Sequence, residues 1–229
     1  MSEPRVIIIG GGIGGLAMGL TLHQIGVRCS IYESVRNLKP LGVGINLQPN
    51  AVRELYELGI GPEILDTVGL PVKEWALAGM QGQDIYSEPR GSFAGYNWPQ
   101  YAVHRGEFHM ALYSRFLDVV GADAFQSGHR AINYRIDEDG RASVKFKTAS
   151  ETVTERADLV IAADGIHSAI RAQMYPDQPP IHWGGVLMWR GTSWAKPVRT
   201  GSSFMGLGTH AHRMVIYPIS HPDPEKGLS

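Results

Sequence analysis

The sequence predicts an α/β fold that begins with a parallel sheet and continues into a β-rich region. Two short apolar runs, at Val6–Ile9 and 158–163, have the composition of buried parallel strands. Apolar residues with helical spacing follow the first run over 16–25 and return over 105–120. From Ile181 onward the composition changes: the sequence becomes rich in Trp, Met and Gly and alternates in the way that is typical of β-strands.

Composition limits the classes of partner. The chain has 229 residues, is 43% hydrophobic and carries a net charge of −1, so no broad field favours nucleic acid or a membrane. Cys29 is the single cysteine, which excludes an intrachain disulfide. Few residues precede the first strand, and no apolar run reaches the roughly 20 residues that span a bilayer. We therefore expect a cytoplasmic protein, either monomer or dimer.

A glycine-rich turn joins the first strand to the first helix. Gly10, Gly12 and Gly15 form the pattern GxGxxG, with Ile13 and Gly14 inside it. The first glycine permits a tight turn, the second lets backbone approach a pyrophosphate, and the third allows close packing of helix and strand. The N–H groups at the helix start favour phosphate. The pattern predicts a Rossmann-like dinucleotide site, with an ordinary βαβ turn as the alternative.

An acidic residue follows the second predicted strand, 28–32. A carboxylate at Glu33 can accept hydrogen bonds from ribose hydroxyls and disfavours a 2′-phosphate. This favours FAD or NAD over NADP at the site. We expect Gly12→Trp or Gly15→Trp to abolish dinucleotide binding with the fold intact.

The remaining elements follow from periodicity and turn residues. We expect a loop over 34–48, and a helix over 51–58 with Asn50 as its N-cap. Further helices are expected over 61–68, 105–120 and 166–175, and strands and loops within 71–104 and at 131–136, 142–146 and 152–154.

A second motif follows the predicted strand at 158–163. Asp164-Gly165 lies at the carboxyl end of a parallel strand, where ligands of α/β proteins bind. The carboxylate can equally cap the helix that follows. Both interpretations stay open, and Ser168 and Arg171 are expected to brace the turn.

Three segments together resemble the class A FAD-dependent aromatic monooxygenases (salicylate hydroxylase-like). They are the Asp-Gly motif within 158–171, the loop and helix within 41–51, and the arginine-led segment 103–107. Further pieces resemble the bacterial 5-methylphenazine-1-carboxylate monooxygenase type: 87–91, 99–107, 175–178, 188–191 and 217–220.

The resemblance implies a fold and a division of the chain. The fold would be a Rossmann-like FAD-binding domain of GR2 type, whose mixed parallel sheet has a β-meander crossover, plus the start of a β-rich substrate domain. The expected ranges are 1–70 for the FAD-binding βαβ unit and flavin-ring loop, 71–104 for an excursion into the substrate domain, 105–178 for the rest of the FAD-binding domain, and 179–229 for the start of the substrate domain.

The resemblance also implies roles for residues. The glycine turn from Gly10 to Gly15 would hold the FAD pyrophosphate and Glu33 the adenosine ribose. Arg105 would reach the phosphate and ribityl region, which explains a cation at a helix start, where the dipole disfavours it. A surface salt bridge of Arg105 with Glu107 or Glu54 is the alternative.

Four further positions are assigned by resemblance. Backbone at Val43 and Gly44 would lie near the isoalloxazine, although a plain turn explains these residues equally. Arg130 would offer backbone to the adenine side, and Asp164 with Gly165 would contact FAD and the reduced nicotinamide.

The family reaction is carried by the flavin. NADH or NADPH reduces FAD, O₂ adds at flavin C4a, and the hydroperoxide hydroxylates a small aromatic or heteroaromatic ring, including carboxylated, phenazine-like rings. Neither a metal nor a protein nucleophile is implied. Arg190 and Tyr217 are guesses for substrate contact, with a surface arginine and a core aromatic as the alternatives.

One departure from the family concerns its later Gly-Asp motif. That motif is absent, and Gly121-Ala-Asp123 is not it, because it lies between a helix and a strand. The chain is also shorter than the family usually is, so we expect it to be incomplete at its C-terminus. The alternatives are a truncated FAD-binding module without catalysis, another FAD-dependent oxidoreductase, or an NAD-dependent dehydrogenase, which the Asp-Gly motif disfavours.

Overall fold

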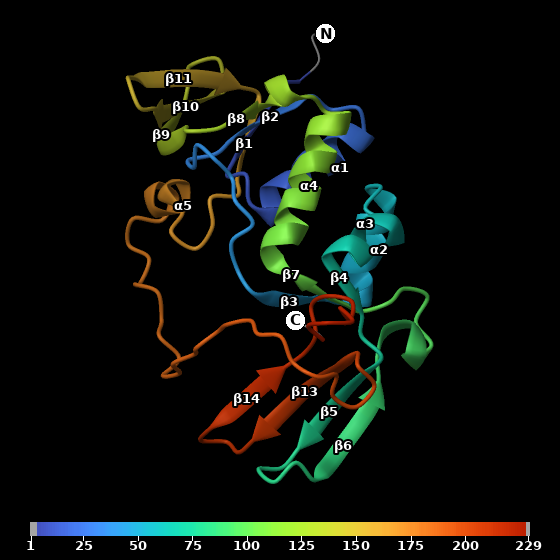
Figure 1. Cartoon of the computed structure of the whole chain (residues 1–229). Helices are drawn as coiled ribbons and strands as arrows, with labels where there is room; N and C mark the ends of the chain where they lie inside the picture. Colours follow the sequence, from blue (N-terminus) through green and yellow to red (C-terminus); the bar gives the residue numbers. More distant parts are fainter. Residues whose placement is uncertain (1–3, 228–229) are drawn as a thin grey trace. The chain divides into compact units, whose positions relative to one another are not determined.

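The computed structural model describes residues 4–227 (Figure 1). The chain divides into two compact units. Unit 1 combines the residues up to Lys39 with Leu112–Met188, and unit 2 combines Pro40–Ala111 with the residues from Trp189 on. The four functional ranges expected from the sequence stay a prediction, because compactness does not test them. No helix in residues 4–227 is long and apolar enough to cross a membrane.

Unit 1 contains a four-stranded parallel sheet of order β12-β1-β2-β8 and a three-stranded antiparallel meander of order β11-β10-β9 (Figure 1). The meander connects β8 to β12, as the sequence predicted. The elements are β1 (Val6–Ile9), α1 (Ile13–Gln24), β2 (Cys29–Tyr32), η2 (Ala122–Ala124), β8 (Phe125–Gln126), β9 (Arg130–Ile136), β10 (Ala142–Lys147), β11 (Thr152–Ala157), β12 (Leu159–Ala162), α5 (Ala169–Met174) and the second half of α4 (Arg105–Val119).

Both faces of the parallel sheet are buried. Strand alternation places Ile7 and Ile9 in one cluster with Phe146 of β10 and Ile170 of α5. On the other face α1 packs closely: a Cβ at Gly19 would lie 2.6 Å from Phe116 of α4 and 3.1 Å from Ile31. This burial explains why Val6–Ile9 is continuously apolar.

Strand β12 differs from its prediction as a buried strand. It pairs with β1 in parallel, but it is an edge strand, and the side chain of Leu159 is 52% exposed. A β-branched run therefore indicated the correct strand and direction, but its burial depends on a neighbour that the run itself does not specify. Helix α5 is also shorter than expected, because 165–168 forms a turn that ends at the N-cap Ser168.

Unit 2 contains a mixed sheet of order β14-β13-β5-β6 and a small antiparallel sheet of order β3-β7-β4 (Figure 1). Its elements are β3 (Gly44–Leu47), α2 (Pro49–Glu57), α3 (Pro62–Val68), β4 (Gly69–Pro71), β5 (Glu74–Ala78), β6 (Asp84–Pro89), η1 (Gly91–Ala94), β7 (Tyr101–His104), the first half of α4, β13 (Ser203–Gly208) and β14 (Arg213–Ile216).

Three further expectations were wrong, two in unit 2 and one over 181–202, a range that both units share. The predicted loop contains β3, which pairs with β7 and therefore depends on a partner more than 50 residues away. Asn50 lies inside α2, whose N-cap is Gln48, because Pro49 occupies the first helical position that proline favours. The strands expected from Ile181 onward do not form before Ser203: the described structure has no named strand over 181–202. Side chains in this range, such as Trp189 (88% exposed), are not covered by a neighbouring strand.

Candidate dinucleotide site

The glycine turn needs glycine at two positions for the fold itself. Gly10 has φ +105°, and a Cβ there would lie 2.4 Å from the Ala163 carbonyl oxygen. A Cβ at Gly15 would lie 1.9 Å from the Gly10 carbonyl oxygen. Neither distance is possible for a real side chain, so the expectation that Gly15→Trp leaves the fold intact is wrong.

The same turn is open at Gly12 and Gly14. A Cβ at either residue would meet no atom within 4 Å, and Gly12 has φ −73°, which any residue can adopt. Gly12 is the N-cap of α1 and supplies no side-chain cap. The first intrahelical bond runs from Leu16 N to Gly12 O, so the N–H groups from Ile13 to Gly15 precede it. This is the arrangement that binds phosphate at a helix start.

Glu33 lies directly beside this turn at the end of β2. Its Oε2 accepts a hydrogen bond from Gly11 N at 2.7 Å, and its Oε1 accepts from Val35 N at 2.7 Å and Ser34 Oγ at 3.0 Å. These bonds fix the carboxylate next to the glycines. A carboxylate has about four acceptor positions, so capacity for a ribose hydroxyl remains.

The segment before β9 runs along the same strand end. His129 N donates to Glu33 O at 2.8 Å, and Gly128 N donates to Val35 O at 3.2 Å. Arg130, the first residue of β9, is exposed next to these contacts. The backbone of this segment is therefore placed near Glu33, where the sequence expected the adenine side.

Asp164 follows β12 at the carboxyl edge of the parallel sheet. Its Oδ2 accepts from Ala169 N at 2.9 Å, which is the helix-capping contact that the sequence left open. Its Oδ1 is buried and has no hydrogen-bond partner within the described residues. Buried carboxylate oxygens are normally paired, so the second oxygen suits a ligand hydroxyl. Gly165 has φ +81°, and Arg171 braces the turn by donating to Ile166 O, as expected.

Unit 2 gathers the other predicted residues around β3. Arg105 N donates to Val43 O at 2.8 Å, and Arg105 Nη1 reaches Leu41 O at 3.5 Å. The alternative salt bridge to Glu54 is not favoured, because Glu54 pairs with Arg53.

Arg190 and Tyr217 converge on Gly44. Arg190 Nη2 donates to Gly44 O at 2.6 Å, and a Cβ at Gly44 would lie 2.5 Å from Tyr217 Cε2. The close approach that Gly44 permits is thus to Tyr217 and Ile219 of the chain itself. These contacts join Gly44 to two later segments, of which the nearer, at Arg190, is 146 residues away in the sequence.

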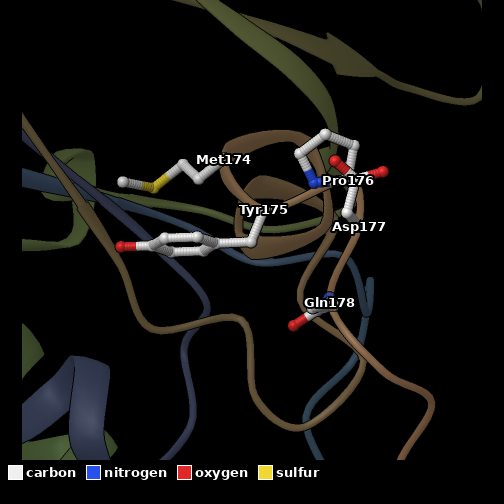
Figure 2. Close-up of a pocket in the computed structure, with 5 residues that line it drawn as sticks. All are labelled: Met174, Tyr175, Pro176, Asp177 and Gln178. Carbon is white, nitrogen blue, oxygen red and sulfur yellow. The ribbon is translucent and has the colours of Figure 1, made fainter.

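Two cavities were not expected. One, of about 460 Å³, is lined by Met174–Gln178 after α5 (Figure 2), and all of its lining comes from one continuous segment. The other, of about 230 Å³, lies in unit 2 and is lined by Asn46, Gln48, Trp75, Glu88, Arg90, Gln100 and Phe204. Five of these seven residues lie in segments that carried the resemblance. The resemblance therefore pointed to these segments, but none of the seven residues was identified as a site residue.

Two further features of residues 4–227 are the grouping of metal-ligating side chains and the environment of the cysteine. No group of three or more His, Cys, Asp or Glu side chains in residues 4–227 could hold a metal ion. Cys29 is buried, and desolvation raises the pKa of its thiol, so the thiolate is disfavoured.

The family model described as FAD binding domain matches residues 3–221. The chain belongs to this FAD-binding family. It is 35% identical to the phenazine 1,6-dicarboxylic acid hydroxylase of Lysobacter antibioticus, over 99% of this chain and 56% of that protein. It is 33% identical to the FAD-dependent urate hydroxylase of Klebsiella pneumoniae, over 94% of this chain and 55% of that protein.

Solved structures agree with this assignment. A variant of Klebsiella pneumoniae HpxO complexed with FAD has a TM-score of 0.76 and 26% identity, and the match covers 95% of this chain and 54% of that chain. The predicted resemblance to FAD-dependent aromatic monooxygenases, including a phenazine carboxylate type, is confirmed. The chain carries an FAD-binding domain, and it spans about half the length of the curated relatives it matches.

Proposed function

We propose that the chain is the FAD-binding part of a flavin-dependent monooxygenase that hydroxylates a small aromatic or heteroaromatic ring. NADH or NADPH would be the electron donor and O₂ the second substrate. The observation that carries the proposal is the open glycine turn beside Glu33, combined with the unpaired oxygen of Asp164. Relatives named for phenazine dicarboxylate and urate hydroxylation support a planar, carboxylated or polar ring as substrate. A cytoplasmic location is part of the proposal.

The residues of unit 1 fit the nucleotide half of FAD. The N–H groups from Ile13 to Gly15 would bind the pyrophosphate, and Glu33 would accept hydrogen bonds from the adenosine ribose. Backbone near Arg130 would lie at the adenine. Asp164 Oδ1 would accept a hydroxyl of the cofactor, which would satisfy the one oxygen that the fold leaves unpaired.

The residues of unit 2 fit the flavin half. Arg105 would pair with the phosphate or ribityl oxygens, and the backbone of Val43 and Gly44 would lie against the ring. Bound FAD would supply O₂ activation and oxygen transfer. Arg190 and Tyr217 would contact the substrate, and their convergence on Gly44 supports placing both beside the ring.

A second function is an FAD-binding module without catalysis. In such a module the glycine turn, Glu33 and Asp164 would bind FAD in the same way. Another class of FAD-dependent oxidoreductase that uses a redox-active cysteine pair is disfavoured, because Cys29 is the single cysteine.

An absorption spectrum followed by an activity assay separates these functions. The 229-residue protein is mixed with FAD and passed over a gel-filtration column. We expect about one flavin per chain, and no retained flavin would overturn the FAD assignment. NADH oxidation is then measured with phenazine-1,6-dicarboxylate and with uric acid. Flavin retention without ring-dependent NADH oxidation would favour the non-catalytic module.

A further inference from the structure

We propose that the 230 Å³ cavity of unit 2 binds the aromatic ring of the substrate by a hydrogen-bond-acceptor edge. This inference rests on the proposed function, since it names the class of ring that the enzyme would hydroxylate. The ligand class is a planar aromatic that presents carboxylate, carbonyl or ring-nitrogen acceptors along one side.

Separate motifs meet at this cavity. Asn46 and Gln48 come from β3 and the start of α2, Arg90 follows β6, and Gln100 precedes β7. Each lies in a segment that the sequence resemblance identified, but no chemical role was given to any of these four residues. Three separate segments, at 46–48, 90 and 100, therefore supply polar side chains to one cavity.

The polar side chains form one connected relay. Arg90 Nε donates to Gln100 Oε1 at 2.9 Å, and Arg90 Nη2 donates to Gln48 Oε1 at 3.3 Å. Gln100 Nε2 then donates to Asn46 Oδ1 at 3.1 Å. Gln100 is only 2% exposed, so its amide cannot exchange these partners for bulk water.

The guanidinium fixes the direction of this relay. An arginine side chain can only donate hydrogen bonds, so the amide oxygens of Gln48 and Gln100 must face Arg90. The amide nitrogen of Gln100 must then face Asn46, whose oxygen accepts. As a result, the groups of Gln48 and Asn46 that the relay does not use are both N–H donors. Within the described residues, neither amide nitrogen has a hydrogen-bond partner.

The charge of the relay is compensated. Arg90 Nη1 pairs with Glu88 Oε1 at 2.7 Å, and Glu88 Oε2 accepts from Tyr86 OH at 2.9 Å. The cavity therefore presents donors without an isolated positive charge. The free amide donors suit neutral and anionic acceptors, whereas a cationic donor would have only the Glu88 carboxylate, whose two oxygens each already accept a hydrogen bond.

Aromatic side chains complete the cavity. Trp75 of β5 and Phe204 of β13 line it, and Phe204 packs against Tyr217 with ring centroids 5.2 Å apart. Flat aromatic surfaces favour stacking with a planar ring, and the amide donors then select its edge. Tyr217, which packs on Phe204, also contacts Gly44, so one side chain links the wall of the cavity to the segment proposed to lie at the flavin.

A matched pair of probes tests the polarity. Benzoate and benzamidine have similar planar shapes, but one presents acceptors and the other cationic donors. Binding to the full chain is measured by ligand-observed NMR, and quenching of tryptophan fluorescence provides a second signal. We expect benzoate to bind at least about tenfold more tightly than benzamidine. The N–H groups of benzamidine would face the amide N–H donors of Asn46 and Gln48, so neither set would find an acceptor there. Nitrobenzene, a neutral acceptor of similar shape, separates the role of acceptors from that of charge.

A single substitution should reverse the preference. Gln48→Glu keeps an oxygen for Arg90 but replaces the unpaired amide N–H donor by a carboxylate oxygen. The affinity for benzoate should therefore fall at least about tenfold, and the affinity for benzamidine should rise. Gln178→Glu, the same substitution at the other cavity, is the matched control and should leave the affinity for both probes unchanged. Trp75→Phe should remove the quenching that the probe causes, while probe binding stays visible by NMR.

The outcomes separate this inference from the proposed function. Flavin retention is recorded for every variant. Equal binding of both probes, binding of neither, or benzoate affinity unchanged by Gln48→Glu would overturn the inference even when flavin is retained. A reversed preference in a protein that retains no flavin would support the cavity and contradict the FAD-dependent function.

Discussion

Gly12→Val separates the phosphate-binding role of the glycine turn from its structural role. A Cβ at Gly12 meets no protein atom within 4 Å, and the φ of −73° is open to valine. The stability cost is therefore that of replacing glycine at an N-cap by an aliphatic residue, about 1 kcal/mol or less. For a protein of this size this lowers Tm by about 2–4 °C.

The cost to cofactor binding is much larger. The valine side chain would occupy the space in which the backbone approaches a pyrophosphate. A hydrogen bond to a charged group contributes about 1.5–3 kcal/mol, so losing two at the start of α1 costs about 3–6 kcal/mol. That corresponds to an increase in Kd of about 10²- to 10⁴-fold.

Calorimetric titration of the apoprotein with FAD measures this change, and circular dichroism checks the fold. Gly184→Val is the matched control, because it is the same substitution in unit 1 at another position with no atom within 4 Å. It should leave FAD affinity unchanged. Wild-type affinity in a folded Gly12→Val protein would refute the placement of the pyrophosphate at this turn.

Three other perturbations concern the fold. Gly15→Ala places a Cβ 1.9 Å from the Gly10 oxygen. We therefore expect the free energy of unfolding, measured with urea, to fall by about 3 kcal/mol. An unchanged free energy of unfolding would contradict the turn geometry. Phe146→Ala removes a fully buried ring stacked on Tyr32 at 4.4 Å and should cost about 3–5 kcal/mol in the same assay; a loss below about 1 kcal/mol would be inconsistent with this core. The hydrogen bond from Arg199 holds the pKa of Glu74 below its ordinary value, so its contribution to stability is present above about pH 4.3 and is lost as the pH falls further. The Tm difference between wild type and Arg199→Met should therefore narrow from pH 7 to pH 3, and a constant difference would exclude this linkage.

The nucleotide half of the site could be predicted from sequence because its determinants are local. Gly10, Gly12 and Gly15 lie within six residues, and their roles follow from the turn between one strand and one helix. Glu33 directly follows the next strand, β2, whose pairing with β1 follows from the βαβ connection. The structure adds a distinction that spacing does not contain: Gly15 is required by backbone packing, whereas Gly12 is open.

The errors concern elements that depend on distant partners. Strand β3 has few β-branched residues and is preceded by Gly42, so it looks like a loop until β7 pairs with it. Strand β12 looks like a central strand, and its edge position is visible only from the sheet order. Residues 181–202 have strand-like composition without a paired strand in the described structure. Local pattern predicts what a segment can form, while pairing decides what it forms.

The unit 2 cavity shows the same limit for function. Asn46, Arg90 and Gln100 are unremarkable as single residues in a sequence, because amides and arginines are common on protein surfaces. Their significance arises from connection: Arg90 can only donate, and this constraint passes through Gln100 to set which atoms of Asn46 remain for a ligand. A substitution that exchanges donor for acceptor at Arg90 should therefore change which atoms Asn46 offers to a ligand. The selectivity of such a site belongs to the relay as a whole, so the residue that determines the preferred ligand edge, Arg90, need not contact the ligand.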